Sequence, residues 1–100
     1  MKTIRATFHK DGYEHELINR IEDVAVYRKS KGSVVSFEVM VVLHHEAYSI
    51  GGRDIEAGEH LPGSEMWGTL GWTFRGSDEA TAWAWKLAGE QRAKKEGTAQ

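Results

Sequence analysis

The chain has no cysteine, a single proline and no excess of positive charge. The absence of cysteine excludes a disulfide framework, a thiol nucleophile and any cysteine-ligated zinc or iron–sulfur site. A formal net charge of −2 argues against a strongly basic nucleic-acid binder, although a local basic patch stays open. The longest apolar run covers residues 39–43, far short of the roughly 20 residues that a membrane span needs. The N-terminal residues contain no apolar stretch typical of a secretory signal, so we expect a cytoplasmic protein.

What remains is an ordinary globular composition. The chain has 100 residues, of which 40% are hydrophobic and 28% are charged. A chain of this length buries about two-thirds of its unfolded surface, which is enough for one hydrophobic core. We therefore predict a single domain over residues 1–100.

The N-terminal part predicts a β-hairpin. Residues 3–9 alternate between apolar and polar side chains, which is the period of a half-buried strand. The Asp-Gly pair at residues 11–12 favours a type I′ turn, because both residues tolerate a positive φ. A turn at this place sets Phe8 opposite His15.

A second hairpin is expected over residues 24–45. The strand at residues 24–29 and the return strand at residues 33–45 are joined by a turn that we centre on Lys31-Gly32. This register pairs Val26 with Phe37. The face of the return strand that carries Phe37 and Val39 is the predicted core.

The other face of the return strand is also rich in apolar residues. It carries Val34, Met40 and Val42, and a sheet face open to water is normally more polar. Either another element of the chain covers these residues or a second subunit does. We predict a homodimer through Val34, Met40 and Val42 as the second of these two solutions.

Residues 46–65 differ in character from the rest of the chain. Five acidic residues oppose the single Arg53, and glycines and the proline interrupt the segment. We interpret it as an acidic connection rich in loops, with at most one short strand. Because its carboxylates have one local partner, we expect them to stay in water and to contribute little to folding.

The C-terminal part predicts a strand followed by a helix. The strand covers residues 67–74, where Gly68 and Gly71 indicate a bulge or a close backbone approach. The helix starts at Ser77 and runs to about Lys95, or ends earlier near Leu87 because Gly89 weakens it.

The helix has one narrow face of small residues. Ala80, Ala84 and Ala88 form a stripe that lets the helix lie close to a sheet. Trp83 and Trp85 flank the stripe, and we expect Trp83 to be more buried than Trp85. The fold class that follows is α+β, with an antiparallel sheet built as a meander of hairpins and one C-terminal helix packed on one face.

The histidines and the recognised catalytic motifs give no sign of enzyme chemistry. His44 and His45 are neighbours on a predicted strand, so their side chains point to opposite faces. His60 with Glu59 or Glu46 would complete a metal site, but the sequence has no established ligand spacing. The sequence also has no nucleophile elbow, P-loop or dinucleotide fingerprint. We predict no cofactor and no enzymatic activity, and keep a metal-dependent site at these histidines as a third hypothesis.

Residues 59–74, with the sequence EHLPGSEMWGTLGWTF, resemble a pattern of small uncharacterised proteins from phages and other mobile elements. In that pattern a Glu–Pro–Glu run precedes Trp-Gly and a final Trp-Thr-aromatic triplet, and a helix follows. The resemblance implies an origin in a mobile element. It implies no activity, cofactor or catalytic residue.

The sequence as a whole predicts a small non-enzymatic protein-binding module with an accessory or regulatory role. The expected contact residues for a basic protein partner are Asp54, Glu56, Glu59 and Trp67.

The alternative is a nucleic-acid-binding module that uses a basic hairpin and exposed aromatic residues. Its expected contact residues are Arg28, Lys29, Lys31 and Trp85. A basic face continuous from Lys31 to Lys95 would favour this alternative, whereas an isolated basic tip would favour the protein-binding module.

Overall fold

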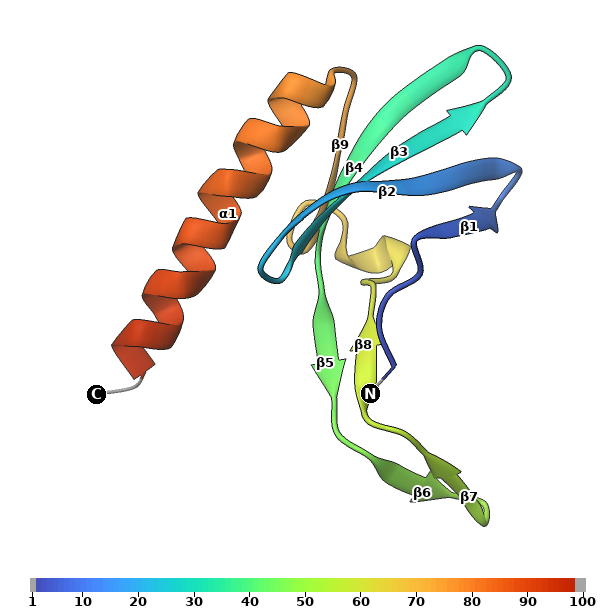
Figure 1. Cartoon of the computed structure of the whole chain (residues 1–100), viewed down its shortest axis with the longest axis vertical. Helices are drawn as coiled ribbons and strands as arrows, with labels where there is room; N and C mark the ends of the chain where they lie inside the picture. The colour runs from blue at the N-terminus through green and yellow to red at the C-terminus, as the bar shows by residue number, and fades with distance from the viewer. Residues whose placement is uncertain (1, 99–100) are drawn as a thin grey trace.

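The computed structural model describes residues 2–98, and the side chains of residues 2–94. Five antiparallel strands form one sheet in the order β1-β2-β3-β4-β9, and one C-terminal helix packs on it (Figure 1). The strands are β1 (Thr7–Lys10), β2 (Tyr13–Ile21), β3 (Val24–Lys31), β4 (Val34–Val41) and β9 (Gly71–Phe74), and the helix is α1 (Ser77–Thr98). The predicted α+β class, with its meander sheet and C-terminal helix, is confirmed.

The first hairpin has the predicted turn. Asp11 and Gly12 both adopt a positive φ, 54° and 83°, and Phe8 pairs with His15. β2 is then interrupted by an irregularity between Leu17 and Asn19, where the pairing with β3 shifts. A bulge of this kind bends and twists the strand locally.

The predicted register of the second hairpin is wrong by two residues. Lys31 pairs with Val34, and Val26 therefore pairs with Val39 rather than with Phe37. The turn is made by Gly32 and the residue after it, because Gly32 takes the positive φ of 60° at the first turn position. A shift of two residues leaves each side chain on its predicted face, so the core face was still correct.

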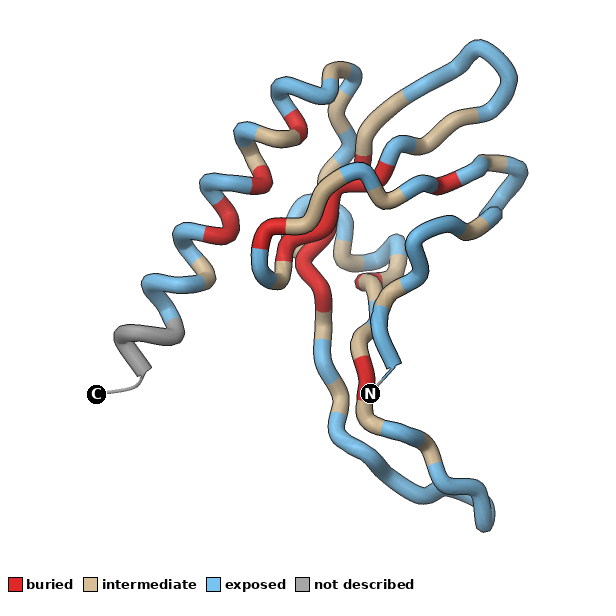
Figure 2. The backbone as a smooth tube through the Cα atoms, viewed as in Figure 1, coloured by how far each residue is buried: buried red, intermediate tan, exposed pale blue. Residues whose placement is uncertain are grey.

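α1 covers one face of the sheet with its stripe of alanines. Ala80, Ala84 and Ala88 are buried in one core cluster with Val24 and Val26. In Figure 2 the buried positions of the helix lie on its side toward the sheet. Their small size lets the helix backbone come close to the strands. The helix continues through Gly89 and ends at Thr98, later than the sequence predicted.

The two helical tryptophans differ as expected. Trp83 packs edge-on against Trp72, with ring centroids 5.5 Å apart, and against Phe74 at 6.3 Å. Trp85 points away from the sheet and is 58% exposed. The prediction that Trp83 is the more buried of the two is confirmed.

The chain itself covers the second face of the sheet. Ala25, Tyr27, Met40 and Val42 form a cluster there, and Ile4, Phe8, Leu17 and Leu61 pack on it. The Tyr27 hydroxyl donates a hydrogen bond to the Arg5 carbonyl at 2.6 Å and so fixes the N-terminal segment over this face. Met40 and Val42 are each 3% exposed and therefore unavailable for the predicted homodimer contact; Val34 is exposed.

Residues 43–60 form a projecting β-ribbon, here called the arm. It comprises β5 (Leu43–His45), β6 (Tyr48–Ile50), β7 (Arg53–Ile55) and β8 (Gly58–His60), with β5 paired to β8 and β6 paired to β7. The prediction of a loop with at most one strand is wrong. The pattern that was missed is a Gly-Gly turn at residues 51–52, where both glycines have a positive φ, between two short β segments.

The chain returns to the sheet through a short 3₁₀ helix, η1 (Ser64–Met66), and a tight turn. β9 starts at Gly71 and not at Trp67, because Gly68 adopts a φ of 90° and turns the chain. A Cβ on Gly71 would lie 2.6 Å from the Trp67 ring, so the predicted close approach is real at this glycine. Among residues 2–98, no helix combines the length and the apolar character needed to cross a membrane.

The contact between α1 and β9 gives the first prediction. Trp83→Ala should lower the free energy of unfolding by about 3–5 kcal/mol, because it empties this contact. Trp83→Phe should cost less, about 1–2 kcal/mol. It keeps an aromatic ring in the contact and breaks no hydrogen bond, because the buried indole N–H has no partner among the described residues. Trp85→Ala should cost less than about 1 kcal/mol. Urea unfolding followed by circular dichroism measures all three, and equal losses for Trp83→Ala and Trp85→Ala would contradict the assigned helix face.

Candidate functional site

A bidentate ion pair holds the base of the arm against the sheet. Arg20, at the end of β2, donates from its two terminal nitrogens to the two carboxylate oxygens of Glu59, at 2.7 and 2.6 Å. The Glu59 side chain is 7% exposed, and its Oε1 also accepts a weaker hydrogen bond from the Ile4 amide at 3.3 Å. Paired, parallel hydrogen bonds of this kind fix geometry as well as charge.

This pairing sets the ionisation of Glu59. The hydrogen bonds from Arg20 hold the pKa of the Glu59 carboxyl below its ordinary value of 4.5, although burial opposes the shift. The same hydrogen bonds raise the pKa of Arg20. Glu59 was expected among the solvated acidic residues that meet a partner, but it is buried and neutralised inside the chain.

Asp23 and His44 extend this group. Asp23 Oδ1 lies 3.0 Å from His44 Nε2 and 3.3 Å from the Arg20 guanidinium. Asp23, His44 and Glu59 offer ligand atoms within 4.8 Å of one another, which is compact enough for a metal ion. Arg20 already supplies the positive charge, since both Glu59 oxygens accept its hydrogen bonds. The arrangement is thus a structural ion-pair group, which we call the clamp: Arg20, Asp23, His44 and Glu59.

The three histidines of the metal hypothesis do not converge. His45 and His60 have ring centroids 5.6 Å apart on the arm. His44 alternates with His45 along β5 and pairs with Asp23 on the opposite side of the ribbon.

The N-terminal segment adds backbone contacts at the base of the arm. The Lys2 amide donates to the Ala57 carbonyl at 3.1 Å, and the Glu59 amide donates to the Lys2 carbonyl at 2.8 Å. A Cβ on Gly58 would lie 2.7 Å from the Lys2 oxygen, so glycine is required for this approach. The base of the arm is therefore part of the folded core, unlike its tip.

The arm tip, formed by β6 and β7, has one apolar side and one polar side. Tyr48 pairs with Ile55, and Ile50 pairs with Arg53, so these four side chains share a side. On the other side Ser49 donates a hydrogen bond to Asp54 at 2.6 Å. Tyr48 is 52% exposed and Ile50 is 65% exposed. Figure 2 shows that most of the arm tip is exposed. The tip therefore presents apolar side chains to solvent as well as the predicted acidic ones.

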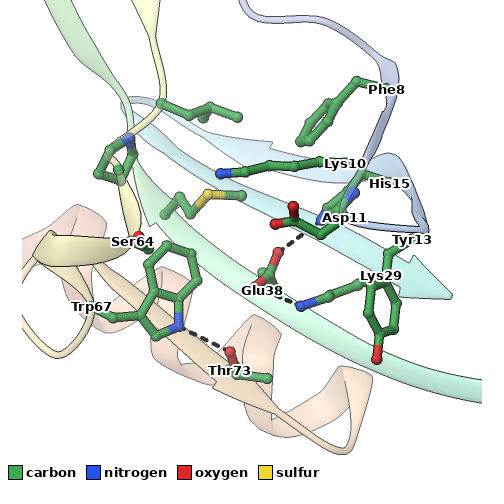
Figure 3. Close-up of a pocket in the computed structure, with 14 residues that line it drawn as sticks. Phe8, Lys10, Asp11, Tyr13, His15, Lys29, Glu38, Ser64, Trp67 and Thr73 are labelled. Atoms are coloured by element: carbon green, nitrogen blue, oxygen red, sulfur yellow. Dashed lines mark hydrogen bonds and ion pairs between the residues drawn. The ribbon is translucent and has the colours of Figure 1, made fainter. Parts of the chain in front are cut away.

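The four residues predicted as partner contacts do not lie together on one surface. Asp54 and Glu56 are exposed on the arm, whereas Glu59 is in the clamp. Trp67 follows η1 and lines a pocket on the sheet, away from the far end of the arm where β6 and β7 lie (Figures 1 and 3).

The pocket lies on the sheet face opposite α1. Its volume is about 460 Å³, and it is bounded by β1, β2, β3 and β4 and by the segment from Leu61 to Trp67. Trp67 donates from its indole N–H to Thr73 Oγ1 at 3.0 Å and rests on Gly71, which fixes the ring as one wall. Phe8, on the β1–β2 hairpin, contributes to the apolar lining (Figure 3).

A buried polar group lies in the wall of this pocket. His15 Nε2 lies 3.1 Å from Glu38 Oε1, and Lys29 Nζ lies 3.7 Å from Glu38 Oε2. Phe8 stacks on the His15 ring with centroids 4.3 Å apart. Neither His15 nor Glu38 stood out in the sequence, because a histidine and a glutamate on separate strands give no local signal.

The basic residues of the nucleic-acid alternative are not brought to one face. Arg28 alternates with Lys29 and Lys31 along β3, so it lies on the opposite side of the sheet. Lys29 is engaged with Glu38, and its ammonium lies 4.5 Å from the centroid of the Tyr13 ring. The tip of the β3–β4 hairpin and the C-terminal end of α1 lie at opposite ends of the molecule (Figure 1). The Lys95 side chain lies outside the described residues.

The clamp gives a pH-dependent prediction. Because the pKa of Glu59 is lower in the folded chain than its ordinary value of 4.5, the pair stabilises the fold above that pH, and this stability is lost as the pH falls below it. Glu59→Gln should lower the free energy of unfolding at pH 7 by about 1–3 kcal/mol. It should also flatten the loss of stability in acid.

Urea unfolding between pH 7 and pH 3 measures both effects. Asp54→Asn, on the exposed arm tip, is the matched control and should leave the pH profile unchanged. If Glu59→Gln lost stability in acid as steeply as the unsubstituted chain, the Arg20–Glu59 pair would not be what stabilises the base of the arm.

Comparison with known proteins gives no relative from which a function could be transferred. No protein-family model, curated protein or solved structure matches this chain. The resemblance of residues 59–74 to phage and mobile-element proteins stays a prediction.

Proposed function

We propose that this chain is a small non-enzymatic protein-binding module whose contact element is the arm tip. The observation that carries the proposal is the exposed apolar side of β6 and β7, with Tyr48 and Ile50 more than half exposed on a ribbon that projects from the sheet. The resemblance to phage and mobile-element proteins extends the proposal to an accessory or regulatory role in such an element.

The exposed side chains of Tyr48 and Ile50 on the arm tip are better placed to bind a partner than to stabilise the fold. Neither Tyr48 nor Ile50 belongs to either core cluster, so neither contributes appreciably to the buried core. Complete burial of an exposed Ile side chain is worth roughly 1.5–3 kcal/mol, and the exposed parts of Tyr48 and Ile50 supply a fraction of that on binding. A tyrosine beside an isoleucine and an arginine also has the composition typical of interface hot spots.

The proposed occupant is a protein partner with an apolar groove that receives the tip. Stable interfaces bury roughly 800 Å² per partner. Four side chains on one side of a short ribbon supply only part of that area, so face-to-face pairing of two arms is a poor solution. A groove contacts the apolar side together with the outer edges of the two-stranded β6–β7 sheet, where backbone groups can pair with an added strand.

The acidic residues of the arm have a separate role in this proposal. Asp54 and Glu56 are exposed, and their charges attract a partner that is basic around its groove. Such charges mainly raise the association rate, and salt weakens the effect. The proposed partner is therefore still basic, as the sequence predicted, but most of the binding energy comes from the apolar side of the arm tip.

The third prediction tests the apolar side. A photo-crosslinking amino acid in place of Ile50 should capture a distinct protein in cells of the native host, because Ile50 lies in the contact. The purified pair should then bind about 10- to 100-fold more weakly when Tyr48→Ser or Ile50→Ser is introduced. The matched control is the crosslinker in place of Ser49, on the polar side of the same strand.

Crosslinking of the same species with equal yield from positions 49 and 50 would contradict a specific apolar contact. Capture of a second copy of this chain alone would replace the proposal with self-association. Circular dichroism of each variant checks that the fold is retained.

The fourth prediction concerns the charges. Asp54→Ser combined with Glu56→Ser should change the free energy of unfolding by less than about 0.5 kcal/mol per site, as for other surface positions. The same variant should lower the association rate with the captured partner and reduce its dependence on salt. Stopped-flow binding at two ionic strengths measures this, and an unchanged rate would remove the acidic residues from the contact.

A further inference from the structure

The pocket on the sheet face has the size and lining of a small-molecule site. Its volume of about 460 Å³ lies within the range of roughly 300–1,000 Å³ that is usual for ligand pockets. Met40 and Pro62 in its lining are buried, and Phe8, Leu61 and Trp67 add apolar surface. Apolar side chains thus line part of the pocket and charged or polar side chains line the rest, which suits a molecule with an apolar ring face and a polar edge.

Glu38 supplies one unused hydrogen-bond acceptor to this apolar space. Its side chain is 9% exposed, and its Oε1 is engaged with His15. Oε2 has Lys29 Nζ at 3.7 Å, an ion-pair distance that is too long for a hydrogen bond. Among the described residues, no group donates a hydrogen bond to Oε2. Oε2 is not among the buried side-chain atoms that lack a partner, so it is open to solvent and to a ligand in the pocket. A hydrogen bond donated to this charged oxygen is stronger than one between two neutral groups.

The charges of the pocket select against an ionic ligand. Lys10 and Lys29 balance Asp11 and Glu38, so the lining is neutral overall when His15 is neutral. A cationic group at Glu38 would meet the ammonium of Lys29, and an anionic group would meet the carboxylate itself. A neutral N–H donor avoids both repulsions.

We infer that the pocket binds a small, flat, uncharged heteroaromatic molecule that donates an N–H hydrogen bond to Glu38 Oε2. The Trp67 ring, held by Thr73 and Gly71, provides a fixed aromatic wall for such a ring system. In the view of Figure 3, Glu38 lies between Trp67 and His15. In this proposal, a ring seated against Trp67 directs its N–H edge to the carboxylate. The site is separate from the arm tip and does not depend on the proposed protein partner.

The test compares two probes that share one ring system. Indole has an N–H donor, and 1-methylindole has none. In ¹H–¹⁵N NMR titrations of the full chain, indole should shift the amides of Glu38 and Leu61 and the indole N–H of Trp67. 1-Methylindole should bind about tenfold more weakly, which corresponds to the loss of one hydrogen bond to a charged group.

Glu38→Met assigns the effect to the carboxylate. This variant keeps the bulk of the side chain but removes the acceptor, so indole and 1-methylindole should bind equally. The matched control is Glu16→Met, an exposed glutamate on the opposite face of β2, which should keep the difference. If Glu38→Met does not fold, titrations of the unchanged chain with tryptamine and indole-3-acetate test the charge argument, and both should bind more weakly than indole.

Equal binding of indole and 1-methylindole to the unchanged chain would overturn the inference. So would tighter binding of tryptamine or indole-3-acetate, or shifts that lie outside the pocket. None of these results bears on the arm tip, because the crosslinking experiment reports on different residues.

Discussion

Residues 24–27 of β3 and 38–41 of β4 are buried on both faces of the sheet, and the rest of the molecule is arranged around that constraint. Val24 and Val26 alternate with Ala25 and Tyr27 along β3, and all four are almost inaccessible to water. One helix can cover only one face of a sheet, so the second face needs a separate cover. The meander brings α1 to the first face, and the N-terminal segment with Leu61 covers the second.

The second cover is assembled from segments that are distant in the chain, and this creates both candidate sites. The N-terminal segment is fixed through the Tyr27 hydroxyl, and Arg20 binds Glu59 at the base of the arm. Between these anchors the segment from Leu61 to Trp67 does not fill the sheet face completely, which leaves the pocket beside Glu38. Beyond the clamp, no other element of residues 2–98 packs on the arm, and its tip stays in solvent (Figure 2).

Local patterns in the sequence were enough for the fold class, the first turn and the orientation of α1, because strand alternation and the alanine stripe depend on neighbouring residues. The register of the second hairpin was missed by two residues, since the turn could be centred on Lys31-Gly32 or one residue later with the same apolar pattern. The candidate sites were mostly beyond prediction. The burial of Glu59 depends on Arg20, 39 residues away in the chain, and the pairing of His15 with Glu38 spans two strands. The ribbon at Tyr48 and Ile50 did carry a local signal, the Gly-Gly turn, which the acidic composition obscured.

Amide hydrogen exchange of the intact chain, read residue by residue by NMR, tests most directly whether two-sided burial of β3 and β4 organises the structure. The amides of Ala25, Tyr27 and Met40 should be among the slowest, because they exchange only when the whole sheet opens. The hydrogen-bonded amides of β6 and β7 should exchange at least about a thousandfold faster, because the arm tip opens without disturbing the core. Comparable exchange rates in the two regions would contradict this account, since they would place the arm tip in the same cooperative unit as the sheet.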